Sequence, residues 1–346
     1  MATMQAVRFM GEGRIVLGEE PVPHLSGPDD VLIEVEAAGI CGTDLQVLKV
    51  PPGHPINDGV VLGHEYAGRV VDVGPGVRMV KPGDRVVVDA NLTCGLCSYC
   101  RNGMSHKCAE MATMGIHVDG GLAGYSVAPE RALHKVPEDL SAEQAALVEP
   151  LACVVHGVDR LGPRPGDSAV VLGAGPIGQM FAQLLRAAGV RPVIVSEPTP
   201  FRRNWAADKD ARVVDPVGGG LEQVVREETG TGADLVVDAV GTLLEQGLAV
   251  VRPGGTVLIF GQNKTHTSTI TPYDLSHREL NILGSYIAPF CFPRAIELLS
   301  RGVVRAESLV SHRFGLGQVN DALELLRGGE AIKIIIDPRR ERLEQT

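Results

Sequence analysis

The sequence predicts an α/β fold in which a doubly wound parallel sheet is inserted into a mostly β domain. Residues 1 to about 90 contain short apolar runs separated by turns rich in glycine and proline, a pattern typical of strands. From about residue 168, runs rich in valine and isoleucine alternate with helical stretches, which predicts βαβ units and a parallel sheet. Near residue 290 this alternation stops, so we expect the chain to return to its first domain there.

The apolar runs define the expected elements in chain order. Strands of the first domain are expected at 31–40, 60–74 and 84–90. In the inserted domain we expect strands at 168–173, 191–197, 211–216, 233–241 and 255–261, with helices at 176–189 and 244–252. The final elements are helices at 289–302 and 314–329 and a strand at 331–338. The predicted domains are therefore 1–152, with a lobe at 91–110, then 153–288, and a return to the first domain at 289–346.

The composition excludes several classes of partner. The chain of 346 residues has 32 lysines and arginines against 42 aspartates and glutamates, a net charge of −10. Nucleic acids and anionic membranes attract basic surfaces, so we expect neither as a partner. No apolar run reaches the roughly 18 residues of a membrane helix, and the N-terminus lacks the pattern of a secretory signal. Seven cysteines in this length do not make a disulfide scaffold, and we expect reduced thiols in the cytoplasm.

A glycine-rich turn follows the first strand of the inserted domain. Gly173, Gly175 and Gly178 form the pattern G-x-G-x-x-G directly after Val170–Leu172 and before a predicted helix. In a dinucleotide site the first glycine permits the tight turn, the second lets the backbone approach the pyrophosphate, and the third packs the helix against the strand. The next strand ends at Glu197, where a carboxylate would accept the adenosine ribose hydroxyls. A packing turn with a solvated acid is the alternative.

Glu197 also bears on the choice of cofactor. A carboxylate at this place repels the additional phosphate of NADP, so NAD is the predicted cofactor. Arg202 and Arg203 follow closely and could attract that phosphate, although two arginines at a helix start are also typical of a solvated surface.

Four cysteines are concentrated in residues 94–108. Cys94, Cys97, Cys100 and Cys108 have the spacing C-x2-C-x2-C-x7-C, and four thiolates are the ligands of a closed tetrahedral zinc site. The segment has few apolar residues to form a core, whereas structural zinc contributes on the order of 10 kcal/mol or more to folding. We interpret the lobe as a structural zinc site. An iron–sulfur cluster, a redox pair and a zinc ribbon that binds DNA are the alternatives, and the acidic chain disfavours the last.

A second set of potential ligands is dispersed along the chain. Cys41 lies in GICGTD, His64 and Glu65 lie in VLGHEYAG, and Glu149 lies in VEP. The first three stand beside glycines at strand-to-turn transitions, where small residues leave room for a ligand. Mixed sulfur, nitrogen and oxygen ligands with an open position are typical of catalytic zinc. The residues alone leave a buried cysteine and a surface His-Glu turn as an equal alternative.

At these residues the sequence resembles the zinc-dependent medium-chain dehydrogenase/reductase family, in particular its polyol, butanediol and threonine dehydrogenase branch. The motifs that match follow the family's order over nearly the whole chain. They are Cys41-Gly42-Thr43-Asp44, Gly63-His64-Glu65-x2-Gly68-x5-Gly74-x2-Val77, the four-cysteine lobe, Glu149-Pro150 and the G-x-G-x-x-G turn.

The resemblance implies a GroES-like catalytic domain that carries two zinc ions and a Rossmann domain that binds the dinucleotide. The catalytic zinc is expected on Cys41, His64 and Glu65, with Glu149 as a direct or water-mediated fourth ligand. Beside the glycines of the turn, the implied cofactor contacts are Pro176, Ile177, Glu197, Arg202, Gly261, Ser285 and Tyr286.

The resemblance also implies a proton relay, in which this chain departs from the family. Thr43 occupies the position that the family uses to relay the alcohol proton, and Asp44 is expected to orient a ligand or the loop. Family members commonly have a histidine three residues after the relay residue, whereas this chain has Gln46. A neutral amide cannot take up a proton as imidazole does, so the outer end of the relay must be ribose hydroxyls and water, or another histidine such as His54.

The implied reaction is the reversible oxidation of a secondary alcohol, a polyol, sugar alcohol or diol, to the ketone by hydride transfer to NAD. In the sorbitol branch an Arg-Tyr pair helps to grip the polyol, and by an unaligned count Ile287 and Ala288 stand there. With Pro289 and Phe290 they predict a more apolar pocket. Threonine and simple alcohols are alternative substrates, and a non-catalytic zinc-binding relative is an alternative of another class. The bipartite fold of the family implies a homodimer or homotetramer.

Overall fold

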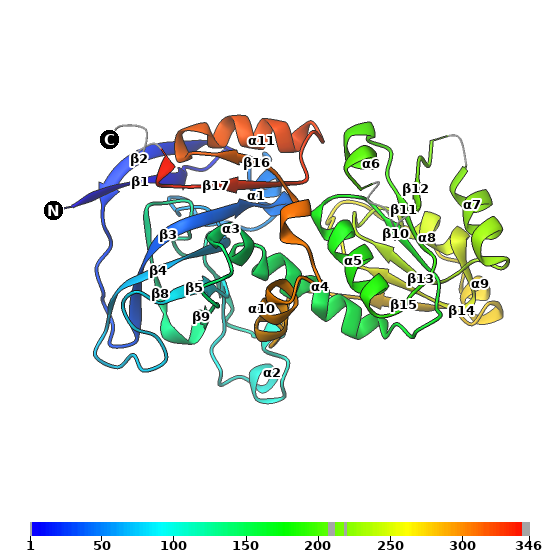
Figure 1. Ribbon diagram of the computed structural model, residues 1–346, viewed down its shortest axis with the longest axis horizontal. Coiled ribbons are helices and arrows are strands. Elements are labelled where there is room, and N and C mark those ends of the chain that lie inside the picture. The colour runs from blue at the N-terminus through cyan, green and yellow to red at the C-terminus, as the bar shows by residue number, and fades with distance from the viewer. Residues whose placement is uncertain (1, 207–211, 218–219, 341–346) are drawn as a thin grey trace. The chain divides into compact units, whose positions relative to one another are not determined.

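The chain folds into two units, each built around its own sheet. The computed structural model describes residues 2–206, 212–217 and 220–340. The first unit comprises Met1–Ala152, Pro289–Gly328 and Lys333–Thr346, and the second comprises Cys153–Ala288 and Gly329–Ile332. In Figure 1 the chain can be followed by colour through the first unit, into the second and back to the first.

A seven-stranded sheet forms the centre of the first unit. Its strands have the spatial order β16-β17-β3-β4-β5-β9, and β8 pairs with the first half of β3. The pair β16–β17 is parallel, and the other pairs in this sheet are antiparallel. The strands are β3 (Asp30–Ile40), β4 (Glu65–Val73), β5 (Arg85–Val88), β8 (Tyr125–Pro129), β9 (Leu133–Lys135), β16 (Val310–Phe314) and β17 (Lys333–Ile336).

Smaller elements complete the first unit. A separate hairpin is formed by β1 (Thr3–Phe9) and β2 (Ile15–Pro21), and a short pair by β6 (Asn91–Leu92) and β7 (Ala112–Thr113). The helices are α1 (Gly42–Val47), α2 (Ser98–Arg101), α3 (Ala142–Ala145), α10 (Phe292–Ser300) and α11 (Val319–Arg327). Helix α4 (Val148–Leu161) runs from the first unit into the second.

The register of the first sheet brings distant segments side by side. Gly39 of β3 pairs with Glu65 of β4 on one side and with Ile335 of β17 on the other. Strand β3 ends directly before Cys41, and β4 begins directly after His64. Because directly opposed residues of neighbouring strands lie about 5 Å apart, the pairing draws two of the predicted ligand segments to one edge of the sheet.

A six-stranded parallel sheet forms the second unit. Its spatial order, β12-β11-β10-β13-β14-β15, is the 3-2-1-4-5-6 order of a dinucleotide-binding fold. Strands β10 and β11 are buried along their whole length, as expected when helices cover both faces of a parallel sheet (Figure 1). The structure confirms the predicted fold class. The elements are β10 (Ala169–Leu172), α5 (Pro176–Ala187), β11 (Val193–Ser196), α6 (Pro200–Ala206), β12 (Arg212–Val214), α7 (Gly220–Thr229), β13 (Ala233–Asp238), α8 (Leu244–Val250), β14 (Val251–Ile259), α9 (Pro272–His277) and β15 (Asn281–Gly284).

Several elements differ from the sequence prediction, among them one shifted strand, one helix and one edge strand. The strand expected at 60–74 begins only at Glu65, because the backbone groups of Val60 and Leu62 bond to β1 instead. Helix α4 and strand β15 were not predicted. Strand β15 has four residues, all at least partly exposed at the sheet edge, so it lacks the apolar run that marks the other strands.

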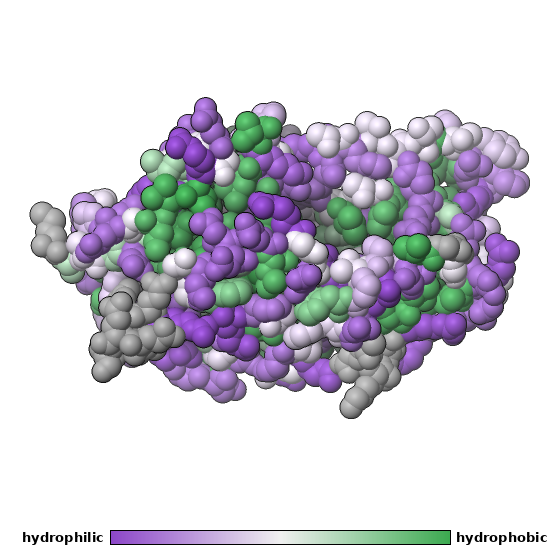
Figure 2. Space-filling view, turned by 90° about the horizontal axis from the view of Figure 1, so that it is seen from above, coloured by the Kyte–Doolittle hydropathy of each residue, from purple (hydrophilic) through white to green (hydrophobic). Residues whose placement is uncertain are grey.

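Hydrophilic and hydrophobic residues are interspersed on the face of the molecule that Figure 2 shows. Several large hydrophobic side chains, among them Val16 and Leu17 of β2, are exposed. Within the described ranges, no helix combines the length and the apolar character that crossing a membrane requires.

Candidate active site and metal centres

Cys41 lies at the junction between β3 and α1. Its extended backbone caps the helix, and the Asp44 carboxylate accepts a hydrogen bond from the Cys41 N–H at 2.8 Å. The Thr43 hydroxyl lies 3.6 Å from Cys41 Sγ. Burial raises the pKa of the Cys41 thiol, and the negative charge of Glu65 adds to this effect. The first turn of α1 therefore holds the predicted ligand, relay residue and orienting carboxylate together.

His64 and Glu65 lie at the start of β4, and both are buried. Gly63 precedes them with a φ of +94°, a backbone conformation that favours glycine. The ligand atoms of Cys41, His64 and Glu65 all lie within 4.8 Å of one another. A sulfur, a nitrogen and an oxygen donor at this spacing could hold a zinc ion.

Asp44 lies close to His64. Its Oδ1 is 3.9 Å from His64 Nδ1, which is too long for a hydrogen bond, and neither atom has a hydrogen-bond partner in the part of the chain that the structure describes. Burial raises the pKa of Asp44, while a positive charge on His64 acts in the opposite direction. Two buried polar atoms without partners beside three donors fit a site whose hydrogen bonds tighten when a metal orients the histidine.

Lys333, which the sequence analysis did not single out, reaches the same cluster. Its Nζ contacts Glu65 Oε2 and donates a hydrogen bond to the Ile40 carbonyl at 3.0 Å. Burial would lower the pKa of the Lys333 ammonium, but the negative charges of Glu65 and Cys41 raise it above its ordinary value. The signal in the sequence is a single charged residue within the apolar run AIKIII.

Glu149 lies in the first turn of α4 and is buried. Burial and the negative charge of Glu65 raise the pKa of Glu149 to about 7. It is not part of the group of donors within 4.8 Å that Cys41, His64 and Glu65 form. The structure thus brings three of the four predicted ligands together and keeps Glu149 as a buried acid that interacts with Glu65.

Gln46 lies in α1, and His54, the alternative outer end of the relay, lies in the loop that follows. The Gln46 carbonyl accepts a hydrogen bond from the Gly53 N–H at 2.8 Å. The Nδ1 atom of His54 lies 2.8 Å from the Pro55 carbonyl. The first contact joins the loop to the backbone of α1, and the second involves the His54 ring within the loop. The relay beyond Thr43 stays a prediction.

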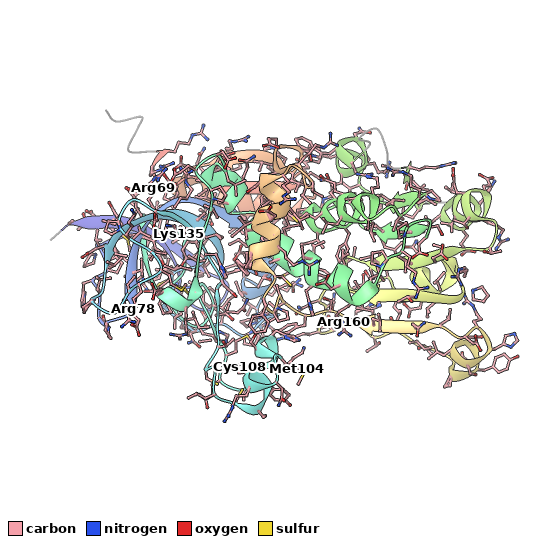
Figure 3. The ribbon with its side chains drawn as sticks, turned by 60° about the horizontal axis from the view of Figure 1, so that its bottom comes forward. Arg69, Arg78, Met104, Cys108, Lys135 and Arg160 are labelled. Atoms are coloured by element: carbon pink, nitrogen blue, oxygen red, sulfur yellow. The ribbon has the colours of Figure 1, made fainter. Side chains whose placement is uncertain are left out.

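The four cysteines of the lobe form a second cluster. The sulfur atoms of Cys94, Cys97, Cys100 and Cys108 all lie within 4.8 Å of one another. Figure 3 labels Cys108 beside α2 in the lobe that projects from the first unit. The Leu96 and Cys97 N–H groups donate to Cys94 Sγ at 3.4 and 3.3 Å.

The lobe has little hydrophobic core of its own. Leu96, Tyr99 and Met104 are exposed, with 81, 46 and 41% of their surface accessible. Backbone N–H groups of Cys100 and Ala109 lower the pKa of Cys97 to about 6. A fold with exposed apolar residues and converging thiols, one of them readily ionised, suits a cation at its centre.

The glycine-rich turn joins β10 to α5. Gly173 has a φ of +102°, and Gly175 caps the helix, with Pro176 as its first residue. A Cβ atom on Gly178 would collide with the Gly173 carbonyl oxygen, whereas a Cβ atom on Gly175 would meet open space. Gly178 therefore packs the helix against the turn, and Gly175 leaves the helix N-terminus open to a phosphate.

Glu197 follows β11 and is buried. Its Oε2 accepts a hydrogen bond from the Ala174 N–H at 2.8 Å, and its Oε1 accepts one from the Thr199 N–H at 2.9 Å. The carboxylate thus joins the glycine-rich turn to the turn after β11. Each oxygen retains a second lone pair that could accept a ribose hydroxyl.

The two arginines after Glu197 are engaged within the second unit. Arg202 donates to the Ala331 carbonyl at 3.3 Å. Arg203 donates to the Glu197 carbonyl at 3.0 Å and pairs with Asp215 at 2.9 Å. Both guanidinium groups therefore have partners in the protein.

The remaining predicted contacts also follow parallel strands. Gly261 follows β14, and Ser285 and Tyr286 follow β15. Val240, which the sequence analysis missed, follows β13, is 46% exposed, and is held by the Asp238 carboxylate, which accepts its N–H at 2.9 Å. In doubly wound sheets ligands bind at this carboxyl edge, and the signal for Val240 is the turn DAVG after an apolar run.

Two sequence families match the chain. Residues 27–138 match the alcohol dehydrogenase GroES-like domain, and residues 176–301 match the zinc-binding dehydrogenase family. The match to the first family lies in the unit that holds both ligand clusters, and the match to the second begins in the glycine-rich turn.

Curated relatives match over most of their length. D-arabinitol dehydrogenase 1 of Uromyces fabae is 34% identical over 325 residues, which cover 90% of each chain. D-altritol 5-dehydrogenase of Agrobacterium fabrum is 35% identical over 91% of this chain and 94% of its own. L-threonine 3-dehydrogenase of Pyrococcus furiosus is 34% identical over 92% of this chain and 94% of its own.

A solved structure gives the same result. A zinc-binding dehydrogenase of Sinorhizobium meliloti 1021, bound to NADP, superposes with a TM-score of 0.91 at 36% identity, and the match covers 98% of this chain and all of that one. Fold, sequence families and relatives therefore agree that this chain belongs to the zinc-dependent medium-chain alcohol dehydrogenase family, whose members are NAD(P)-dependent oxidoreductases.

Proposed function

We propose that the chain is a zinc- and NAD-dependent dehydrogenase that reversibly oxidises a secondary alcohol, a polyol, sugar alcohol or diol, to the ketone. The observation that carries the proposal is the cluster of the partly buried Cys41 with the buried His64 and Glu65, whose mixed donors suit a zinc ion that keeps a position open for substrate. Two of the relatives described above are named for sugar alcohols, which supports this substrate class.

Cys41, His64 and Glu65 would hold the catalytic zinc, and Glu149 would complete the site directly or through water. Bound zinc supplies Lewis acidity, which lowers the pKa of an alcohol oxygen. Asp44 fixes the Cys41 backbone, and its carboxylate, 3.9 Å from His64 Nδ1, would orient the imidazole once a bound metal draws the two into a hydrogen bond.

Thr43 is the proposed proton carrier. Its hydroxyl can accept the proton of the substrate hydroxyl and donate its own, and it stands next to Cys41 at 3.6 Å from Sγ. Gln46 has no basic atom in its side chain, so we assign it no part in proton transfer.

A second zinc ion is proposed for the lobe. Cys94, Cys97, Cys100 and Cys108 would hold it as a closed site, which leaves no position for substrate. Its role is structural, because the lobe has exposed apolar side chains in place of a core.

NAD fits the second unit better than NADP. The Glu197 carboxylate stands where the additional phosphate of NADP would meet a negative charge. Arg203 pairs with Asp215, which offsets its charge, whereas Arg202 makes one hydrogen bond to the Ala331 carbonyl and keeps its charge. NAD bound there would supply the hydride acceptor for the substrate carbon. The Sinorhizobium relative holds NADP, so the two cofactors have to be compared directly.

The substrate side of the proposal rests on the segment 286–290. Ile287 and Ala288 stand where an Arg-Tyr pair is expected in the sorbitol branch, and Ile287 and Phe290 have positive φ values of 46 and 57°. A β-branched residue rarely adopts this conformation, so the segment is held in an unusual backbone path. Apolar side chains at this segment favour a diol or a less polar sugar alcohol as the substrate.

L-threonine is a second candidate substrate, because the threonine dehydrogenase of Pyrococcus furiosus is as similar to this chain as the arabinitol enzyme is.

We also propose that the chain acts in the cytoplasm, which its cysteine usage favours, and that it forms a homodimer or homotetramer, as the bipartite fold of the family implies. Light scattering on the purified protein measures the assembly directly.

A substrate panel tests the proposed function. Zinc-loaded protein is assayed by reduced-nicotinamide absorbance with sugar alcohols, diols, L-threonine and simple alcohols, with NAD and NADP side by side. We expect the highest kcat/KM with a polyol or diol and a preference for NAD of at least about tenfold. If L-threonine gives the highest kcat/KM, the proposed substrate class is wrong and L-threonine takes its place. If the zinc-loaded protein turns over no alcohol at all, the proposed function is overturned.

A further inference from the structure

Lys333 is a buried cation whose place in the site is not explained by binding substrate or cofactor. Its side chain is 2% exposed, and so is that of its partner Glu65. A buried ammonium is costly unless it is paired and hydrogen-bonded, and Lys333 meets both conditions through Glu65 Oε2 and the Ile40 carbonyl. The contact is therefore a specific feature of the fold.

Gly39 makes the contact between Lys333 and Glu65 possible. The two side chains come from β17 and β4, which lie on opposite sides of β3. Gly39 occupies the position of β3 between them, and a Cβ atom there would collide with Glu65 Oε2 and lie 2.8 Å from Lys333 Cε. The backbone of Gly39 has no positive φ, so the lack of space for a side chain, and not the backbone conformation, requires glycine at this position.

The two partners of Lys333 belong to the two segments that carry the proposed ligands. The Ile40 carbonyl directly precedes Cys41, and Glu65 directly follows His64. One ammonium thus links the backbone before the sulfur ligand to the side chain of the oxygen ligand. Because Lys333 takes Oε2 of Glu65, the other carboxylate oxygen, Oε1, is the one left for a metal.

We propose that Lys333 is a positioning residue of the metal site, which holds Glu65 and the Ile40 carbonyl so that Cys41, His64 and Glu65 converge on one zinc ion. The inference rests on the proposed function, because it presumes that this cluster binds zinc. Lys333 itself touches neither substrate nor cofactor in this role, and its effect is transmitted through Glu65.

Zinc affinity, measured by competition with a chromogenic chelator, tests the role. Lys333→Met keeps an unbranched side chain that is one atom shorter and removes its charge, and we expect it to weaken zinc binding at the cluster about 10- to 100-fold, the usual effect of losing a group that orients a ligand. In a Glu65→Gln background the same substitution should change the affinity less than about twofold, because the group it acts through is already altered. Equal losses in both backgrounds would mean a general structural role and would overturn the proposal.

Two further variants keep the test decisive. Gly39→Ala inserts a methyl group between the partners and should weaken zinc binding in the same direction, so the proposal remains testable if Lys333→Met fails to fold. Arg85→Met is the control, since Arg85 forms a largely buried ion pair at 2.8 Å with Glu36, a residue of β3. It should lower thermal stability and leave zinc affinity unchanged, and a loss of affinity as large as that of Lys333→Met counts against the proposal.

Cys41→Ala distinguishes a failure of the proposed function from a failure of the proposed role of Lys333. It should remove one zinc per chain and leave the zinc of the four-cysteine lobe in place. If it removes none, the cluster does not bind zinc and the proposed function fails. If it removes one while Lys333→Met and Gly39→Ala bind zinc as the wild type does, the proposed function stands and the role of Lys333 is wrong.

Discussion

Asp44, Glu65 and Lys333 are charged residues that the fold buries almost completely. Burial raises the pKa of Asp44, and the negative charges around Lys333 raise its pKa. Charges persist in such surroundings only where they pair, accept hydrogen bonds or bind a metal. Their concentration around Cys41 is therefore the strongest single-residue sign of function in the first unit.

Thr43 and Gln46 give a direct test of the proton path. Thr43→Val removes the hydroxyl at nearly constant volume, and we expect kcat to fall about 10²- to 10⁴-fold, the range typical of general acid–base groups. Gln46→Ala should change kcat less than about threefold, because its amide takes up no proton. Both variants are compared by steady-state kinetics at saturating alcohol and NAD. Equal large losses would show that the relay runs through Gln46 as well.

Local motifs and the family resemblance together indicated the candidate ligands, whose binding of zinc stays a prediction. Cys41, His64, Glu65 and the lobe cysteines stand in short patterns, and the structure brings each set together. Lys333 escaped notice because its contact with Glu65 joins residues 268 positions apart. That contact depends on the register of β17, β3 and β4 and on Gly39, which has no side chain to separate Lys333 from Glu65. Neither condition can be predicted from local periodicity.

In the turn between β10 and α5, Gly178 and Gly175 have different roles, packing for the first and space for a phosphate for the second. We expect Gly178→Ala to lower stability by about 1–3 kcal/mol, because the added methyl group meets a backbone oxygen that cannot give way. Gly175→Ala should leave the melting temperature unchanged, since its Cβ atom meets open space and its φ of −65° suits alanine. It should weaken NAD binding at least about tenfold by obstructing the phosphate. Differential scanning calorimetry and a fluorescence titration with NAD measure the two effects, and a reversed pattern contradicts this assignment.

Element prediction succeeded where burial is uniform and failed where it is mixed. Strands β10 and β11 are buried throughout and were expected at nearly their observed positions. Strand β15 is half exposed along four residues, and its pairing with β14 rather than its composition makes it a strand. Propensity is weak evidence for such an edge element, because tertiary pairing decides it.

The two units differ in how their residues are distributed along the sequence. The second unit is almost continuous in sequence, whereas the first needs residues from both ends of the chain. We expect a fragment of residues 147–288, which keeps α4 whole, to unfold cooperatively and to gain thermal stability with NAD. A fragment of residues 1–146 should stay unfolded until a fragment of residues 289–346 is added. Circular dichroism of the fragments checks this, and independent folding of residues 1–146 would contradict it.

The pairing of β17 with β3 also has a consequence for synthesis of the protein. Lys333 and Ile40 are 293 positions apart, so the last strand leaves the ribosome long after its partner. Until then the end of β3 presents unpaired backbone groups, and Glu65 has no ammonium beside it. The Rossmann unit can fold during translation, while the first unit waits for the final segment. A premature stop codon shortly before Lys333 would therefore disturb the cluster of Cys41, His64 and Glu65, which lies near the beginning of the chain.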